Sequence, residues 1–129
     1  MSKERPSVDQ WLREAREDSG AGCGMYLVHN GTVRQTARAA VREGAQDAPT
    51  VTGMVFGYDA EKVAQAVEET RALPGIFHVR VWLNEGELAL GDDIMLVLIG
   101  GDIRPHVVNA LEYLVGAIKT RCVTEEELY

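Results

Sequence analysis

The sequence has few basic residues, few cysteines and no long hydrophobic run, and each shortage excludes a class of protein. Its 13 Lys and Arg residues against 20 Asp and Glu residues give a formal charge of −7. General nucleic-acid binding needs a basic face and is therefore not expected. No apolar run approaches the roughly 18 residues of a membrane span, and the N-terminal residues do not resemble a signal peptide. We expect a cytoplasmic protein that does not contact membranes.

The cysteines and histidines form no recognisable metal-binding pattern. Cys23 and Cys122 are far apart in the sequence and are expected to be reduced thiols. The histidines also lack ligand spacing: His29, His78 and His106. The sequence contains no Gly-rich dinucleotide motif, no P-loop and no serine-nucleophile elbow. We therefore expect no metal and no bound cofactor, and Cys122 is open to either packing or sulfur chemistry.

The hydrophobic pattern predicts a single α+β domain over residues 1–129, with a mixed or antiparallel sheet and helices packed on it. A Ser-x-x-Gln capping box at Ser7 marks the first helix. Alternation over 76–83 indicates a strand with one exposed face that carries His78, Arg80 and Trp82. The predicted helices cover 7–18, 59–73 and 104–119, and the predicted strands cover 21–33, 50–58, 76–83, 88–90 and 94–99.

Two segments show no periodicity that would place them in the sheet or the helices. Residues 35–49 are rich in Ala, Arg, Gln and Gly, and we expect a mobile loop there. Residues 122–129 contain three consecutive glutamates, Glu125, Glu126 and Glu127, and we expect this segment to be a frayed acidic tail.

Four cationic residues stand beside predicted structural breaks, where they could bind an anion. Arg34 follows the glycine bend at Gly31, and Arg104 begins the last helix. Lys119 and Arg121 stand at the end of that helix. A guanidinium binds two oxygens of a phosphate or carboxylate at once, and a helix N-terminus adds free N–H donors. Spacing alone also allows a simpler reading, in which Lys119 and Arg121 only complement the negative end of the helix dipole.

Several short blocks, in the same order, resemble the large, catalytic subunit of molybdopterin synthase, also called molybdopterin converting factor subunit 2. Together they span about residues 20–121. The blocks are Gly31-Thr32-Val33-Arg34, Gly86-Glu87-Leu88 with Gly91-Asp92, the strand that ends at Ile99, Arg104 with its helix, and Ile118-Lys119-Thr120-Arg121.

The resemblance implies an α/β hammerhead-like α+β fold, a homodimer and a role in molybdenum cofactor biosynthesis. It implies a partner, a small ubiquitin-like sulfur carrier whose C-terminal Gly-Gly thiocarboxylate enters a pocket. The implied reaction converts cyclic pyranopterin monophosphate to molybdopterin by installing two sulfurs as a dithiolene. By position, Arg34 and Arg104 would bind the anionic substrate or the carrier terminus, Arg121 is a further anion-binding candidate, and Lys119 would be the catalytic lysine.

The sequence departs from the family pattern at positions that are usually cationic or histidine. Thr32 stands where the family has Lys, Leu83-Asn84 replaces a His-Arg pair, and Ile103 replaces a His. The second catalytic lysine aligns with Glu126. Each charge-assisted contact is worth about 1.5–3 kcal/mol, so these losses weaken the binding of a phosphate-bearing substrate.

Three interpretations therefore remain open from the sequence. The first is a divergent synthase subunit, an enzyme with an incomplete catalytic set that uses Arg34, Arg104 and Lys119. The second is a non-catalytic homologue that acts as a protein-binding module, and the third is an unrelated α+β domain. The first two predict that the three cationic side chains converge on one cavity at a dimer interface.

Overall fold

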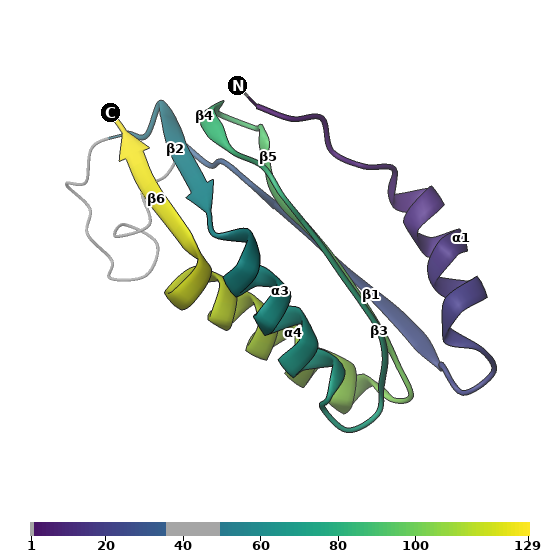
Figure 1. Cartoon of the computed structure of the whole chain (residues 1–129). Coiled ribbons are helices and arrows are strands. Elements are labelled where there is room, and N and C mark those ends of the chain that lie inside the picture. Colours follow the sequence, from purple (N-terminus) through teal and green to yellow (C-terminus); the bar gives the residue numbers. More distant parts are fainter. Residues whose placement is uncertain (1, 36–49) are drawn as a thin grey trace.

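Two antiparallel three-stranded sheets and three α-helices make up the part of the chain that the computed structural model describes, residues 2–35 and 50–129 (Figure 1). The predicted α+β class is confirmed, whereas the predicted loop over 35–49 lies outside the described residues except at its first position. None of the described helices is long and apolar enough to cross a bilayer. The elements are α1 (Val8–Ser19), β1 (Met25–Thr32), β2 (Gly53–Tyr58), α3 (Ala60–Arg71), β3 (Ile76–Leu83), β4 (Gly86–Ala89), β5 (Asp93–Gly101), α4 (Arg104–Ala117), a π-helical turn η1 (Ile118–Cys122) and β6 (Val123–Leu128).

Strand β5 is the centre of the first sheet, whose order is β1-β5-β3. Its apolar residues from Met95 to Ile99 are almost completely buried, as the continuous hydrophobic run predicts. On β1, Leu27 lies opposite Ile99 and His29 lies opposite Val97. The pairing register shifts between Gly31 and Thr32, which confirms the predicted bend at this glycine.

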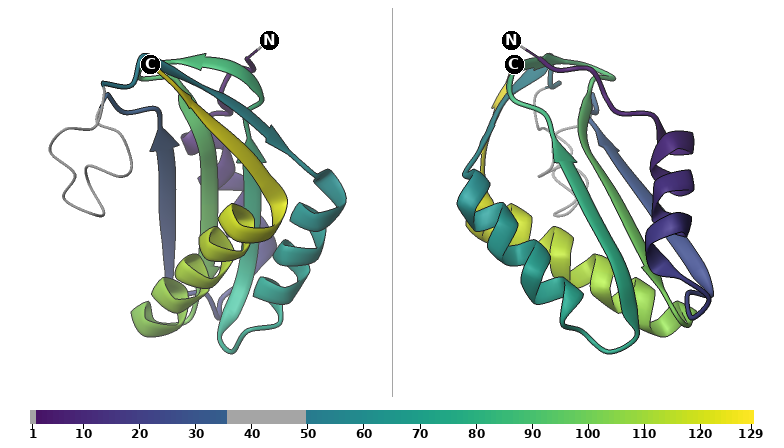
Figure 2. Two further views of the ribbon diagram at one scale, coloured as in Figure 1. Left: turned by 90° about the vertical axis from the view of Figure 1, so that its left-hand side faces the viewer. Right: turned by 45° about the vertical axis from the view of Figure 1, so that its right-hand side comes forward.

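Helices cover both faces of this sheet, with α3 and α4 on one side and α1 on the other (Figures 1 and 2). On the α4 side, the buried face of the helix carries Val107, Ala110 and Leu114, each without exposed surface. Since side chains alternate along a strand, Leu27 and His29 share the face of β1 that is directed toward α4.

The β3 face that we expected to be exposed is covered by α1. Trp11 and Ala15 of α1 are buried against the sheet, and Arg80 of β3 forms an ion pair with Glu14. The Arg80 guanidinium also lies 4.5 Å from the centre of the Trp11 ring. Alternation showed that the two faces of β3 differ in polarity. It did not show that an amphipathic helix with a complementary charge packs on the polar one.

The predicted frayed tail over 122–129 is wrong, because residues 123–128 form strand β6. This strand pairs with β2 along its length in the second sheet, whose order is β4-β2-β6. Paired residues share a face, so Glu125 and Glu127 lie on the same face as buried Phe56 and Met54. Three consecutive glutamates indicate a solvent-exposed segment. However, backbone pairing with the open edge of β2 does not depend on side-chain polarity.

Candidate functional site

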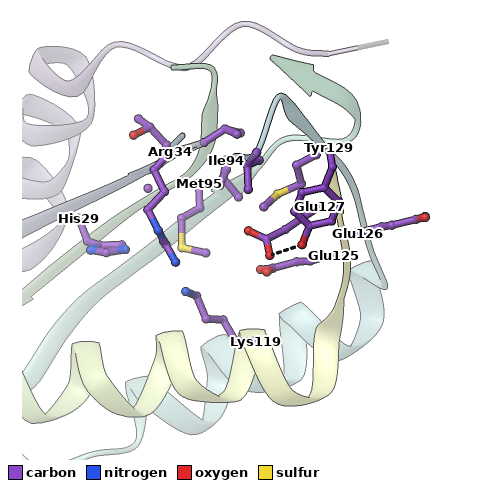
Figure 3. A pocket seen from close by; sticks show the side chains of 14 residues that line it. His29, Arg34, Ile94, Met95, Lys119, Glu125, Glu126, Glu127 and Tyr129 are labelled. Atoms are coloured by element: carbon purple, nitrogen blue, oxygen red, sulfur yellow. Dashed lines mark hydrogen bonds between the residues drawn. The ribbon is translucent and has the colours of Figure 1, made fainter. Parts of the chain in front are cut away.

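A cavity of about 610 Å³ lies where the end of β1 approaches η1 and β6 (Figure 3). Its lining comes from β1 and the residues after it, from β5, from η1 and from the C-terminal strand. This volume falls within the range typical of small-molecule sites, about 300–1,000 Å³. The cavity is therefore large enough for a phosphorylated heterocycle.

Three nitrogen-bearing side chains form one wall of the cavity: His29 from β1, Arg34 from the segment that follows it, and Lys119 from η1. Figure 3 shows the ends of Arg34 and Lys119 pointing into the same space. Within residues 2–35 and 50–129, no hydrogen bond or ion pair holds any of the three. Two neighbouring cations without a carboxylate partner favour the binding of an anion between them.

Local packing positions Lys119 toward the cavity. Ile118 and Cys122, at the two ends of η1, are buried, and Thr120 donates a hydrogen bond of 2.8 Å to the Gly116 carbonyl. These contacts fix the turn while Lys119, between the two buried residues, stays half-exposed. Wide helical turns of this type are frequent at functional sites because they redirect one side chain out of the regular helix.

The pKa of His29 is lowered, first by burial and then by the positive charge of Lys119. Both causes disfavour the imidazolium, so the imidazole of His29 is neutral at pH 7. A neutral ring without a hydrogen-bond partner in the described chain keeps one nitrogen lone pair available.

Carboxylates form the opposite wall, because β6 contributes its three glutamates to the lining. Tyr129 donates a hydrogen bond of 3.3 Å to Glu127. Glu126 is directed away from Lys119 in Figure 3, consistent with its pairing to exposed Val55. The cavity therefore has a cationic side and an acidic side.

The other two predicted anion-binding residues lie outside this cavity lining in the single chain. Arg104 is exposed at the start of α4, and the rise of an α-helix places it roughly 20 Å from Lys119. Arg121 forms an ion pair of 2.7 Å with Glu69, which also accepts a hydrogen bond from Tyr113. The structure thus brings Arg34 and Lys119 together and leaves Arg104 and Arg121 elsewhere.

The sequence pattern did not single out His29 as a site residue, and it left Cys122 open to either packing or sulfur chemistry. A signal for His29 existed, since it continues the inward-facing series Met25 and Leu27 on β1 as the one polar member. Cys122 is buried in the core, and burial raises the pKa of its thiol, which keeps it protonated. Of the two roles left open for Cys122, its buried position fits packing in the core. Across residues 2–35 and 50–129 no three His, Cys, Asp or Glu side chains gather as metal ligands.

The sequence matches the family model described as MoaE protein over residues 1–121. The chain belongs to the MoaE family. Its fold is similar to molybdopterin synthase from Staphylococcus aureus, with a TM-score of 0.74, 18% identity and coverage of 98% of this chain and 87% of that chain. A MoaE protein from Burkholderia ambifaria MC40-6 gives a TM-score of 0.71, 18% identity and coverage of 96% and 80%.

The complex of subunits 1 and 2 of molybdopterin-converting factor from Helicobacter pylori 26695 gives a TM-score of 0.65, 15% identity and coverage of 95% and 79%. No curated protein matches the sequence. The MoaE fold and the role in molybdenum cofactor biosynthesis are thereby confirmed, and the interpretation as an unrelated α+β domain is excluded. At such low identity the solved structures establish the shared fold alone.

Apart from Glu126, the positions expected to depart from the family pattern have structural roles or face solvent. Leu83 is buried in the main core. Asn84 is 2% exposed and forms hydrogen bonds with the backbone of Lys3 and of Asp93. Ile103 and Thr32 are exposed. None of these side chains adds a charge to the cavity, so its cationic wall rests on Arg34 and Lys119.

Proposed function

We propose that this MoaE protein transfers sulfur from the thiocarboxylated C-terminus of a small ubiquitin-like carrier to cyclic pyranopterin monophosphate, which yields molybdopterin. The observation that carries the proposal is the pair Arg34 and Lys119, which point into one cavity of about 610 Å³. Both the pterin phosphate and the carrier terminus are anionic, and both need cationic partners.

The two side chains suit different parts of this chemistry. Arg34 offers a planar fork that holds a phosphate through two parallel hydrogen bonds. Lys119 offers a compact ammonium that stabilises the oxyanion formed when the carrier carbonyl becomes tetrahedral. A Gly-Gly terminus has no side chains, so it can extend past the half-buried walls to reach Lys119. Lys119 is thus the proposed catalytic residue.

A homodimer would give Arg104 a place in the same reaction. Strand β1 is an outer strand of its sheet, and its eight residues contain no proline, lysine, arginine, aspartate or glutamate that would block edge pairing. Antiparallel pairing of two β1 edges about a two-fold axis would bring the start of one α4 toward the end of the other. Arg104 of a second copy would then approach Lys119. Arg121 would bind an anion only after release from Glu69.

A second candidate function is a non-catalytic module that binds a carrier-like protein. The acidic strand β6 favours it, because Glu126 occupies the position where the second family lysine aligns and faces away from Lys119. The Helicobacter pylori complex of subunits 1 and 2 supports a small-subunit partner under either candidate. Light scattering of the protein alone tests for the homodimer, and light scattering with the carrier added tests for the complex of the two proteins.

The two functions are separated by mixing the purified protein with a thiocarboxylated carrier and the pterin precursor, followed by assay of the dithiolene product. Sulfur transfer predicts product with the wild-type protein, and a loss of about 100-fold or more in Lys119→Ala. Arg34→Ala should mainly raise the KM for the pterin. Lys62→Ala on α3, outside the cavity lining, is the matched control and should retain activity. Carrier binding by the wild-type protein without any product would favour the binding module.

A further inference from the structure

We propose that His29 is the general base that activates the water consumed in sulfur transfer. The proposal rests on the proposed function and adds a catalytic group to its site. A thiocarboxylate that gives up its sulfur must leave as a carboxylate, so one oxygen atom has to come from water. That water needs a proton acceptor close to the carrier carbonyl, and neither Arg34 nor Lys119 is suited to this when charged.

His29 lies in the same cavity as the two cations, and a general base has to be placed within such a site. It lies on the face of β1 directed toward α4, opposite Val97, and lines the same cavity as Lys119 and Arg34. Figure 3 shows its ring on the β1 side of the space above Lys119. The imidazole is therefore placed where a bound acyl group would meet both the ammonium and a water molecule.

The neighbouring residue on the same face of β1 is Gly31, which leaves the ring open. A Cβ atom at this position would stand 3.9 Å from His29 Nε2 and 3.2 Å from Met95 Cγ. Any longer side chain at position 31 would therefore extend over the imidazole or displace Met95. The absence of a side chain keeps Nε2 accessible from the cavity.

The charges that face His29 favour its neutral, basic form. Lys119 approaches from η1 and Arg34 from the end of β1, while Glu125 and Glu127 of β6 lie across the cavity beyond Lys119. Burial and the Lys119 charge lower the pKa of His29. The ring is thus a base at neutral pH and becomes an acid after it has taken a proton.

The step balances without an oxidant or reductant. The carrier sulfur first bonds to a pterin carbon while the bond from that carbon to an oxygen substituent breaks and the oxygen leaves with the electron pair. Carrier and pterin are then joined as a thioester. His29 takes a proton from water while the water oxygen bonds to the carbonyl carbon, and Lys119 faces the resulting oxyanion. The carbon–sulfur bond of the carrier then breaks, and its electron pair stays on the sulfur as a pterin thiolate. The carrier carboxyl group still holds the second proton of the water, releases it to solvent and leaves as a carboxylate, while the proton on His29 passes to the thiolate or to solvent.

The test compares His29→Gln and His29→Phe with the wild-type protein in single-turnover sulfur transfer. We expect the rate to fall by about 100-fold or more, in line with the loss of a general base, while carrier binding changes less than twofold. The acidic limb of the pH–rate profile should disappear, and a carrier–pterin thioester should accumulate in intact mass spectra. His78→Gln is the matched control, because His78 lies on the α1 side of the sheet. Its rate and pH profile should match those of the wild-type protein.

Two further measurements separate this proposal from the proposed function. The first is the hydrolysis of a carrier bearing a C-terminal thioester to a small thiol, which needs the base but no pterin. The second is NMR titration of His29, whose pKa should rise in Lys119→Met. Dithiolene formation at the wild-type rate in both His29 variants would overturn the role of His29 and leave sulfur transfer intact. If thioester hydrolysis depends on His29 but no dithiolene forms, sulfur transfer is overturned and the base is retained.

Discussion

Asn84→Ala should be strongly destabilising, because Asn84 makes four hydrogen bonds in a site that is 2% exposed. Its Oδ1 accepts from the Lys3 and Glu85 amides at 2.7 and 2.9 Å, and its Nδ2 donates to the Asp93 and Lys3 carbonyls at 2.8 and 3.2 Å. A net value of about 0.5–1.5 kcal/mol for each bond, reduced because water can reach Lys3, predicts a loss of about 2–4 kcal/mol. For a domain of this size the melting temperature would fall by roughly 10 °C. Urea unfolding and hydrogen exchange at the Lys3 amide measure the effect.

The matched control is Asn30→Ala, since Asn30 also makes several hydrogen bonds but is exposed. Asn30 accepts from Arg5 at 2.7 Å and donates to Asp93 and to the Met95 carbonyl at 3.0 Å. Water replaces bonds at an exposed site, so this change should cost less than about 1 kcal/mol. Equal losses of stability in the two variants would contradict this prediction, because the number of hydrogen bonds rather than their burial would then set the cost.

Three further predictions concern capping, a thiol and pH. Ser7→Ala removes the side chain that accepts from the Gln10 amide and should cost about 0.5–2 kcal/mol in urea unfolding, whereas Ser7→Asp should preserve the cap. Cys122, whose thiol has a pKa raised by burial, should react with a disulfide reagent only as fast as the protein unfolds, after half-buried Cys23. Because the pKa of His29 is lowered on folding, the unfolded chain binds its proton more tightly. The free energy of unfolding should therefore fall as pH drops below about 6.5, and His29→Gln should flatten that slope.

Local patterns were sufficient for most of the fold. The capping box at Ser7, the N-cap at Asp59 and the apolar run that ends at Ile99 each specify an element through contacts within a few residues, and the structure has all three. The bend at Gly31 was also predictable, because a glycine inside a strand pattern often marks a bulge. The structure has a register shift at this position. These signals depend only on residues close together in the sequence, so they predict the elements without any knowledge of tertiary contacts.

The predictions that were wrong or missing concern residues whose partners are far away in the sequence. Strand β6 exists because β2, some 70 residues earlier, offers an edge, and no property of Glu125 and its neighbours reveals that edge. Likewise Arg121 forms an ion pair with Glu69 of α3 and does not line the cavity. The separation of Arg104 from Lys119 is different, because their places at the start of α4 and in the turn that follows it already follow from the sequence. His29 was missed because its role depends on the approach of Lys119 across the fold, which sequence spacing does not show.

The role of the cavity is tested most directly by locating the C-terminus of the bound carrier. The carrier in its carboxylate form is mixed with the protein and treated with a carbodiimide, which joins a carboxylate to an amine in contact with it. Mass spectrometry then identifies the modified lysine. We expect an isopeptide bond between the terminal glycine and Lys119. Linkage confined to Lys3 or Lys62, with Lys119 unmodified, would contradict the claim that this cavity receives the carrier.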